Sequence, residues 1–172
     1  DRGTCVLFGD GAGAAVIQAG ETGVIHMVMG SDGARGQVLT CTARTDGNVF
    51  NGKTPEFGYI QMDGQEVFKF AVKKVPECIR QVLDESGTSM DEIKYFVLHQ
   101  ANYRICEAVA KRLKQPLEKV PMNIDRFGNT SGATVPILLD ELNREGKLER
   151  GDKIVLAGFG GGLTWGAVLL EW

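Results

Sequence analysis

The sequence has few of the features that metal sites, disulfides and membrane anchors depend on. Only two histidines and four cysteines occur among its 172 residues. The cysteines, which form no C-x-x-C pair, are Cys5, Cys41, Cys78 and Cys106. This spacing argues against a zinc site and favours free thiols in a reducing compartment. No apolar run approaches the roughly 20 residues that a membrane-spanning helix needs. We therefore expect a cytoplasmic protein with no bound metal and no membrane contact.

An excess of positive charge is also absent. The 19 Lys and Arg residues are outnumbered by 22 Asp and Glu residues, which gives a net charge of -3 at pH 7. Without a global basic field, the chain is not expected to bind nucleic acid, although a local basic patch remains compatible with this composition. No signal peptide is visible and the first residue is Asp1 rather than Met. We expect the natural N-terminus to lie further upstream.

Glycine, in contrast, is abundant, with 23 of 172 residues, against a usual frequency of roughly 7%. Two glycine-rich segments resemble each other, at residues 5–17 and 154–170. Each consists of an apolar stretch, a glycine-rich turn and a second apolar stretch, which predicts an antiparallel pair of strands. The similarity suggests two related halves, with most of the first half absent. A chance similarity between two glycine-rich hairpins is the alternative.

The remaining pattern alternates between strands and helices, which predicts an α/β layered architecture. We expect Pro76 to kink the first helix and Gly87 to end it. The spacing of Ser89 and Glu92 is typical of a capping box. A long segment rich in Gly, Asp and Asn, residues 30–58, is expected to be a loop. The expected strands are 24–29 and 95–98, and the expected helices are 65–85, 101–114 and 131–145.

Three motifs carry side chains or backbone groups suited to catalysis. His99 follows a buried strand, where α/β proteins collect ligand-binding groups, and a buried neutral imidazole can donate a hydrogen bond to a carbonyl. Asn129 lies in a glycine-flanked turn, and its amide is a donor with no proton to lose. The glycines of residues 158–166 leave backbone N–H groups accessible, as an oxyanion hole requires. Each motif also has a structural interpretation: a buried histidine with satisfied hydrogen bonds, a turn with a helix cap, and a tight turn.

Two further patterns do not support a function of their own. Residues 9–13 lack the spacing of a dinucleotide-binding fingerprint, and a strand rather than a helix is expected after them. Residues 129–131 match a glycosylation sequon, but the loop looks buried and the protein is expected to be cytoplasmic.

Three motifs, in their order along the chain, resemble those of the condensing enzymes of the thiolase superfamily, specifically ketoacyl synthase III. They are H-Q-A-N (99–102), G-N-T-S-G-A (128–133) and G-F-G-G-G-L-T-W-G (158–166). The opening F-G-D-G-A-G-A-A-V fits the same family, so the resemblance covers essentially the whole chain. Elongating ketoacyl synthases have a second histidine where this chain has Asn129. Thiolases have a reactive cysteine in the last glycine motif, where this chain has none.

The resemblance implies a five-layer αβαβα fold made of two halves. Residues 1–22 would then be the closing strands of a mostly absent N-terminal half, and residues 23–172 the C-terminal half. The family's nucleophilic cysteine belongs to the first half, upstream of Asp1. None of the four cysteines lies in that motif's context, so this chain alone is expected to be inactive.

The resemblance also implies an acyltransferase that condenses an acyl-coenzyme A, acetyl-coenzyme A above all, with malonyl-acyl carrier protein to initiate fatty acid biosynthesis. His99 and Asn129 would stabilise the enolate left by decarboxylation, and the Gly161 N–H would contribute to an oxyanion hole. The coenzyme A thioester is a substrate, and no permanently bound cofactor is implied. Rival interpretations are a condensing enzyme making another ketide or quinolone, and a non-catalytic module that binds coenzyme A or an acyl carrier.

The implied partners are the acidic acyl carrier protein, the N-terminal half and a second subunit of a homodimer. An acidic partner predicts a basic docking surface, for which an ordinary solvated helix face is the alternative. By the resemblance, Asn102 would contact the pantetheine arm. The residues expected at the carrier-protein surface are Lys69, Gln100, Ala101, Asn102, Tyr103, Arg104 and Lys111.

Overall fold

The computed structural model describes residues 4–41, 50, 52 and 58–172. At its centre is a four-stranded sheet with the strand order β1-β6-β5-β4. The strands β4 and β5 are parallel, and the other neighbours are antiparallel. A separate two-stranded sheet pairs β2 with β3. The bounds are β1 Val24–Ser31, β2 Leu39–Cys41, β3 Ile60–Met62, β4 Ile93–Leu98, β5 Lys153–Gly160 and β6 Thr164–Glu171.

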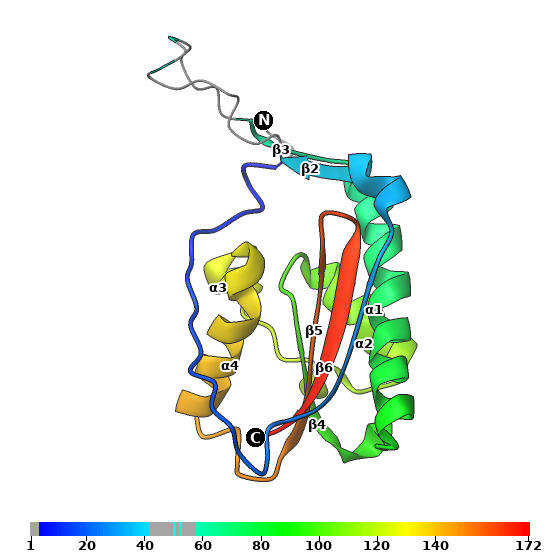
Figure 1. The fold of residues 1–172 in the computed structure, drawn as a ribbon, viewed down its shortest axis with the longest axis vertical. Helices are drawn as coiled ribbons and strands as arrows, with labels where there is room; N and C mark the ends of the chain where they lie inside the picture. Colours follow the sequence, from blue (N-terminus) through cyan, green and yellow to red (C-terminus); the bar gives the residue numbers. More distant parts are fainter. Residues whose placement is uncertain (1–3, 42–49, 51, 53–57) are drawn as a thin grey trace.

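Helices lie on both faces of the four-stranded sheet (Figure 1). They are α1 (Gly64–Ser86), α2 (Tyr103–Leu113), α3 (Ile124–Phe127) and α4 (Thr134–Arg144). Short 3-10 helices are Gly33–Val38, Met90–Glu92, Leu117–Lys119 and Ser131–Ala133. Strand β4 shows how the layers form. Its Phe96 and Leu98 pack with α1 and α2, whereas Val97 packs with α4, because successive side chains of a strand point to opposite faces.

The predicted strands and helices agree with these bounds to within a few residues. Helix α1 begins after Asp63, whose carboxylate accepts hydrogen bonds from the backbone N–H groups of Gln65 and Glu66. It ends at Gly87, which has a φ of 68°. Pro76 lies within the continuous helix, and the capping box of Ser89 and Glu92 is present. Of the predicted loop, residues 42–49, 51 and 53–57 lie outside the described residues; the others include the Gly33–Val38 helix and β2.

The N-terminal segment, residues 4–23, does not form the antiparallel pair predicted from its pattern. None of these residues belongs to a strand of the described structure, and the segment's isolated bridge joins Phe8 to Asn129. The segment runs past α3 and α4 before entering β1 (blue in Figure 1). The physical reason is that an isolated two-stranded hairpin is at best marginally stable, and this segment has no neighbouring strands beside it. That residues 1–22 close a sheet of another half stays a prediction.

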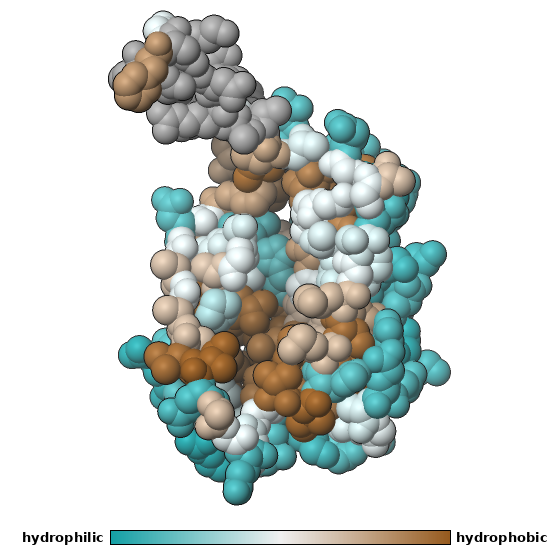
Figure 2. All heavy atoms as spheres, in the orientation of Figure 1, coloured by the Kyte–Doolittle hydropathy of each residue, from teal (hydrophilic) through white to brown (hydrophobic). Residues whose placement is uncertain are grey.

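Apolar side chains remain exposed on the N-terminal segment and on strand β1, which follows it. Val16 is 99% exposed and Met29 is 80% exposed. Figure 2 shows apolar patches over the lower part of the face drawn. Across the described residues, no helix combines the length and the apolar character needed to cross a bilayer.

Candidate active site

The three motifs converge on one cavity. It has a volume of about 790 Å³, and His99, Asn129 and Gly161 all line it. Strands β4 and β5 are parallel, so their carboxyl ends lie at the same edge of the sheet. That edge is where open α/β sheets hold their ligands. The order of the strands therefore brings His99 and the glycine run together, and the loop that carries Asn129 lines the same cavity.

His99 is held by three contacts. Its backbone N–H donates to the Ala157 carbonyl at 2.8 Å, which continues the parallel ladder beyond β4. Its ring packs edge-to-face on Phe159, with the ring centroids 5.3 Å apart. Its Nδ1 lies 2.7 Å from the Thr134 hydroxyl oxygen. Burial lowers the pKa of His99 from 6.5 to about 4, so the imidazole is neutral at pH 7.

Asn129 is 8% exposed, and its backbone is fixed by the N-terminal segment. Its N–H donates to the Leu7 carbonyl at 2.9 Å, and its carbonyl accepts from the Gly9 N–H at 3.0 Å. The side-chain Oδ1 accepts a hydrogen bond from the Ser131 N–H at 2.9 Å. With the oxygen engaged, the amide Nδ2 remains as the donor available to a ligand. The helix-cap interpretation, in which Thr130 or Ser131 caps the following helix, is not supported: Thr130 makes no side-chain cap, and the residue at the N-cap of α4 is Ala133 rather than Ser131.

Gly161 lies in the turn between β5 and β6. Its carbonyl accepts a hydrogen bond from the Thr164 hydroxyl at 3.0 Å, which stabilises the turn. A Cβ added at Gly158 would lie 3.9 Å from the Cβ of His99. Even a methyl side chain at Gly158 would therefore be in van der Waals contact with His99.

A second cavity, of about 380 Å³, lies beside the start of α2. Lys69, Asn102 and Arg104 line it together, and Asn102 lines the first cavity as well. The Asn102 side chain accepts from the Arg104 N–H at 2.9 Å, so it caps α2. Lys69 forms an ion pair with Glu66 at 2.8 Å, which offsets part of its charge.

The other residues predicted at the docking surface divide into two groups. Lys111, on α2, and Tyr103 are exposed, and Ala101 is half-buried in the wall of the first cavity. Gln100 has no accessible surface. Its Nε2 donates to the Leu98 carbonyl at 2.9 Å, and its Oε1 accepts from the Asn123 N–H. The assignment of Gln100 to the docking surface is therefore corrected, because a side chain without accessible surface does not reach a partner.

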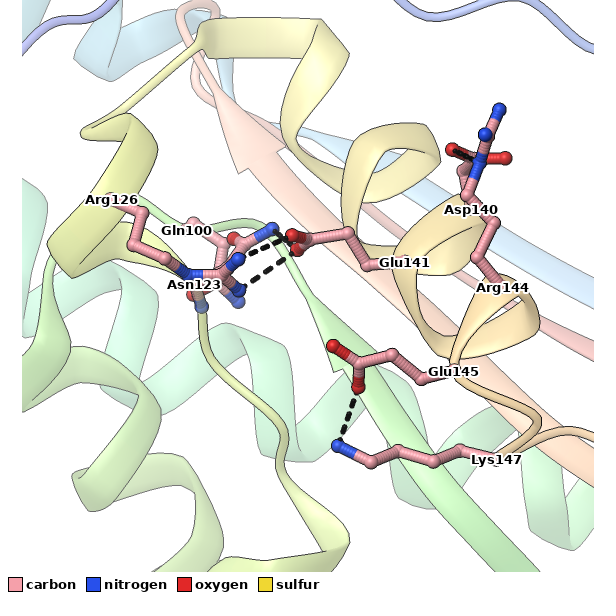
Figure 3. A network of polar contacts seen from close by, with 8 residues as sticks. All are labelled: Gln100, Asn123, Arg126, Asp140, Glu141, Arg144, Glu145 and Lys147. Carbon is pink, nitrogen blue, oxygen red and sulfur yellow. Dashed lines mark hydrogen bonds and ion pairs between the residues drawn. The ribbon is translucent and has the colours of Figure 1, made fainter.

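Gln100 instead belongs to a polar network that the sequence did not reveal (Figure 3). Asn123 donates through its side chain to Glu141 of α4, and Arg126 binds the same carboxylate through two N–H groups, at 2.7 and 3.2 Å. A bidentate pair of this kind fixes geometry as well as adding energy. The network joins the residue after His99 to the helix that carries Thr134.

The two buried cysteines are not suited to act as nucleophiles. Cys78 and Cys106 are buried, and burial raises the pKa of Cys78 to about 11 and that of Cys106 to about 12. Such thiols stay protonated and unreactive. Cys5 and Cys41 are exposed, and Cys41 lines the first cavity. Among the described residues, no three His, Cys, Asp or Glu side chains gather in a group that could hold a metal ion.

Two family models match this chain. Residues 83–172 match the family described as 3-oxoacyl-[acyl-carrier-protein (ACP)] synthase III C terminal, and residues 1–33 match the one described as 3-oxoacyl-[acyl-carrier-protein (ACP)] synthase III. A β-ketoacyl-[acyl-carrier-protein] synthase III of Clostridium acetobutylicum is 50% identical, over 100% of this chain and 54% of the relative. The corresponding protein of Clostridium novyi is 49% identical over the same shares.

Solved structures agree. The 3-oxoacyl-[acyl-carrier-protein] synthase III of Aquifex aeolicus superposes with a TM-score of 0.88 at 44% identity, covering 100% of this chain and 52% of that one. The Pseudomonas aeruginosa protein gives 0.84 at 39% identity, with the same coverage. The predicted fold, the C-terminal half of a thiolase-like α/β architecture, is confirmed by these matches. The chain spans about half the length of the relatives it matches.

Proposed function

This chain belongs to the 3-oxoacyl-[acyl-carrier-protein] synthase III family, and from that premise we propose that it forms the C-terminal half of an acyltransferase. The complete enzyme condenses an acyl-coenzyme A, with acetyl-coenzyme A as the expected donor, with malonyl-acyl carrier protein and so initiates fatty acid biosynthesis. The observation that carries this proposal is the convergence of His99, Asn129 and Gly161 on one cavity.

His99 and Asn129 act on the enolate. Loss of carbon dioxide from the malonyl group leaves negative charge on the thioester oxygen. The neutral imidazole of His99 and the Asn129 amide each donate a hydrogen bond to that oxygen. Fixed donors in a site sheltered from water stabilise such charge more than water does. Each donor lowers the barrier to decarboxylation by about 2.7–4 kcal/mol, the scale measured when one oxyanion-hole donor is removed.

The test separates the two half-reactions in the full-length synthase. Asn129→Ala should slow malonyl decarboxylation by about 10²–10³-fold, and acyl transfer to the enzyme should suffer less, because charge develops on a different oxygen in that step. His99→Ala should be less selective, since the imidazole also helps maintain a thiolate. The matched control is Asn143→Ala, at an exposed position of α4. If Asn129→Ala instead blocked acyl transfer and left decarboxylation intact, the assigned role would be wrong.

The nucleophilic cysteine comes from the N-terminal half. The raised pKa values of Cys78 and Cys106 support this, since neither thiol ionises near neutral pH. Radiolabelled acetyl-coenzyme A should therefore transfer no label to a chain of only these 172 residues. The exposed Cys41 is the residue to check, because it lines the cavity. Label that is present in the chain and lost in Cys41→Ser would overturn the proposal.

The acyl carrier protein docks beside the second cavity, and the pantetheine arm passes Asn102 into the first. Support comes from Asn102, which lines both cavities, and from the exposed Arg104 at the rim. Lys69, Lys111 and Tyr103 extend this surface. The enzyme works as a homodimer in the cytoplasm, and coenzyme A enters only as part of the thioester substrate.

Arg104→Glu tests the docking surface. The substitution should raise the apparent KM for malonyl-acyl carrier protein much more than that for acetyl-coenzyme A, and added salt should shrink the difference. Arg150→Glu is the control, because Arg150 is exposed just before β5 begins, away from the carboxyl end of that strand. An equal change for both substrates would show that Arg104 does not contact the carrier protein.

A further inference from the structure

Thr134 is the first residue of α4, and its hydroxyl group lies between two groups of the H-Q-A-N segment. The hydroxyl oxygen is 2.7 Å from His99 Nδ1 and 3.4 Å from the Gln100 backbone nitrogen. The residue is 2% exposed. A buried hydroxyl normally has partners for both its hydrogen and its oxygen.

Counting donors and acceptors at this oxygen decides where its hydrogen goes. The Gln100 backbone N–H can only donate, so the Thr134 oxygen accepts from it. The hydroxyl hydrogen then requires an acceptor. Among the hydrogen bonds of the described residues, Thr134 Oγ1 has no carbonyl or carboxylate partner, and its other partner is His99 Nδ1. The hydrogen therefore points at Nδ1, which accepts it through its lone pair.

The geometry points to Thr134 as a positioning residue: its hydroxyl donates to His99 Nδ1 and holds the imidazole in the tautomer that carries its hydrogen on Nε2. This inference deepens the proposed function and rests on it. An enolate oxygen needs a donor, and a neutral imidazole has one N–H. If that N–H were on Nδ1, it would point at Thr134, and Nε2 would present only a lone pair to the substrate.

Two other features support this role of Thr134: the ring of His99 is neutral, and α4 is held in place. Burial keeps the ring neutral near pH 7, so protonation does not supply a second N–H. Helix α4 is also anchored: Glu141, about two turns beyond Thr134, binds Arg126 and Asn123 (Figure 3). Asn123 in turn donates to Gln100 through its backbone N–H. The network therefore holds both α4, which carries the Thr134 hydroxyl, and Gln100, which follows His99 in the chain.

The test combines a spectroscopic readout with a rate. Histidine-selective ¹⁵N labelling of the full-length synthase gives the ring nitrogen shifts, and the His99 signals are assigned by their loss in His99→Asn. We expect the protonated nitrogen of His99 to be Nε2. Thr134→Val keeps the side-chain shape and removes the hydroxyl, so it should shift the ring toward the Nδ1–H tautomer. Malonyl decarboxylation should then slow by roughly 10- to 100-fold, taking the scale from the loss seen when the hydrogen-bond partner of a metal-binding histidine is removed.

Thr134→Ser is the rescue variant, because it keeps the hydroxyl. It should restore both the Nε2–H tautomer and most of the decarboxylation rate. A wild-type ring protonated on Nδ1 would overturn the inference without any variant, and so would a normal rate in a folded Thr134→Val enzyme whose tautomer had changed. Failure of the proposed function would look different: the wild-type enzyme would show Nε2–H and yet decarboxylate no malonyl group.

Discussion

The β5–β6 hairpin and the N-terminal segment have similar compositions and opposite environments. Both are apolar and both contain closely spaced glycines. In the hairpin, β5 lies between β4 and β6, and β6 lies between β1 and β5, so both strands are central in the sheet. Leu169 of β6 has no accessible surface. In the N-terminal segment, residues 4–23, Val16 is almost completely exposed and no strand forms.

The difference shows that neighbouring strands, more than the local pattern, decide whether such a segment becomes a hairpin. Each strand needs a hydrogen-bonding partner and an apolar face to cover. The β5–β6 hairpin has both within the chain, because β4 and β1 flank it in the sheet. The N-terminal segment is anchored near the site by the backbone hydrogen bonds of Leu7 and Gly9 with Asn129, and at its end Gly23 accepts a hydrogen bond from the Glu171 N–H. It nevertheless lies where Leu7 and Phe8 line the cavity, so this anchor bears on the site.

The largest expected effect comes from truncating one apolar side chain in each region. Leu169→Ala should lower the free energy of unfolding of the chain by about 2–5 kcal/mol, because it leaves a cavity in the core. Val16→Ala should change it by less than about 0.5 kcal/mol, because its side chain is in solvent. Urea unfolding followed by circular dichroism measures both.

The same pair tests the two-halves interpretation. In the full-length synthase, residues 14–17 are expected to form a buried strand, so Val16→Ala should become clearly destabilising there. An equally small effect in both proteins would contradict the prediction that residues 1–22 close a sheet of the N-terminal half.

Acid should weaken the C-terminal region selectively. Burial lowers the pKa of His99 to about 4 from 6.5. As the pH falls below 6.5, the unfolded state takes up a proton before the folded state does, so stability is complete above that pH and is lost progressively down to about pH 4. The loss should reach on the order of 3 kcal/mol. Urea unfolding at several pH values, with His99→Asn as the reference, measures this loss of stability. Residues 4–23 bury no ionisable side chain, so they should not contribute to it. Equal acid sensitivity in His99→Asn would show that another group is responsible.

The sequence predicted those parts of the fold that depend on local periodicity. The apolar spacing of residues 65–85 and the Gly87 stop signal correspond closely to α1. It also predicted that His99, Asn129 and Gly161 belong together, but through the resemblance of three motifs rather than through their spacing. The hairpin predicted at residues 5–17 does not form, and a local pattern does not encode the neighbouring strands that a hairpin needs to be stable.

The supporting contacts of the site could not be predicted. Thr134 contacts His99 across 35 positions of sequence, and Glu141 binds Asn123 across 18. Such pairs depend on how α4 packs on the sheet. Gln100 was misassigned for the same reason, since its neighbours Ala101 and Asn102 line the cavity while its own side chain points into the core.

A smaller effect is expected from Gly9, the point where the N-terminal segment is anchored. A Cβ at this position would lie 2.0 Å from the Phe127 carbonyl oxygen, so the backbone must shift. Gly9→Ala should therefore cost about 1–3 kcal/mol and weaken the hydrogen bonds that the segment makes with the Asn129 backbone. Hydrogen exchange at the Asn129 amide, which donates to the Leu7 carbonyl, measures this weakening.

The matched control is Gly20→Ala. Its Cβ would meet only the Thr22 carbonyl oxygen, at an ordinary 3.6 Å. Exchange at Asn129 should be faster in Gly9→Ala and unchanged in Gly20→Ala. Unchanged exchange in both variants would mean that the N-terminal segment is not held by this contact.

The smallest effect on stability is expected from charge on the exposed apolar residues 14–17, and it also tests whether this segment pairs with strands of an N-terminal half. Val16→Lys and Ile17→Lys should each change the free energy of unfolding of the chain by less than about 0.5 kcal/mol. The double variant should nevertheless bind less hydrophobic dye and self-associate less, because exposed apolar patches promote both. In the full-length synthase the order should reverse: the wild type should bind little dye, and the double variant should be strongly destabilised, since two lysines would be buried without partners. Dye fluorescence and light scattering on the four proteins decide the matter. A wild-type chain that stays monodisperse and binds no dye would mean that residues 14–17 need no partner, and the contrast between the two glycine-rich regions would then have to be explained within this chain alone.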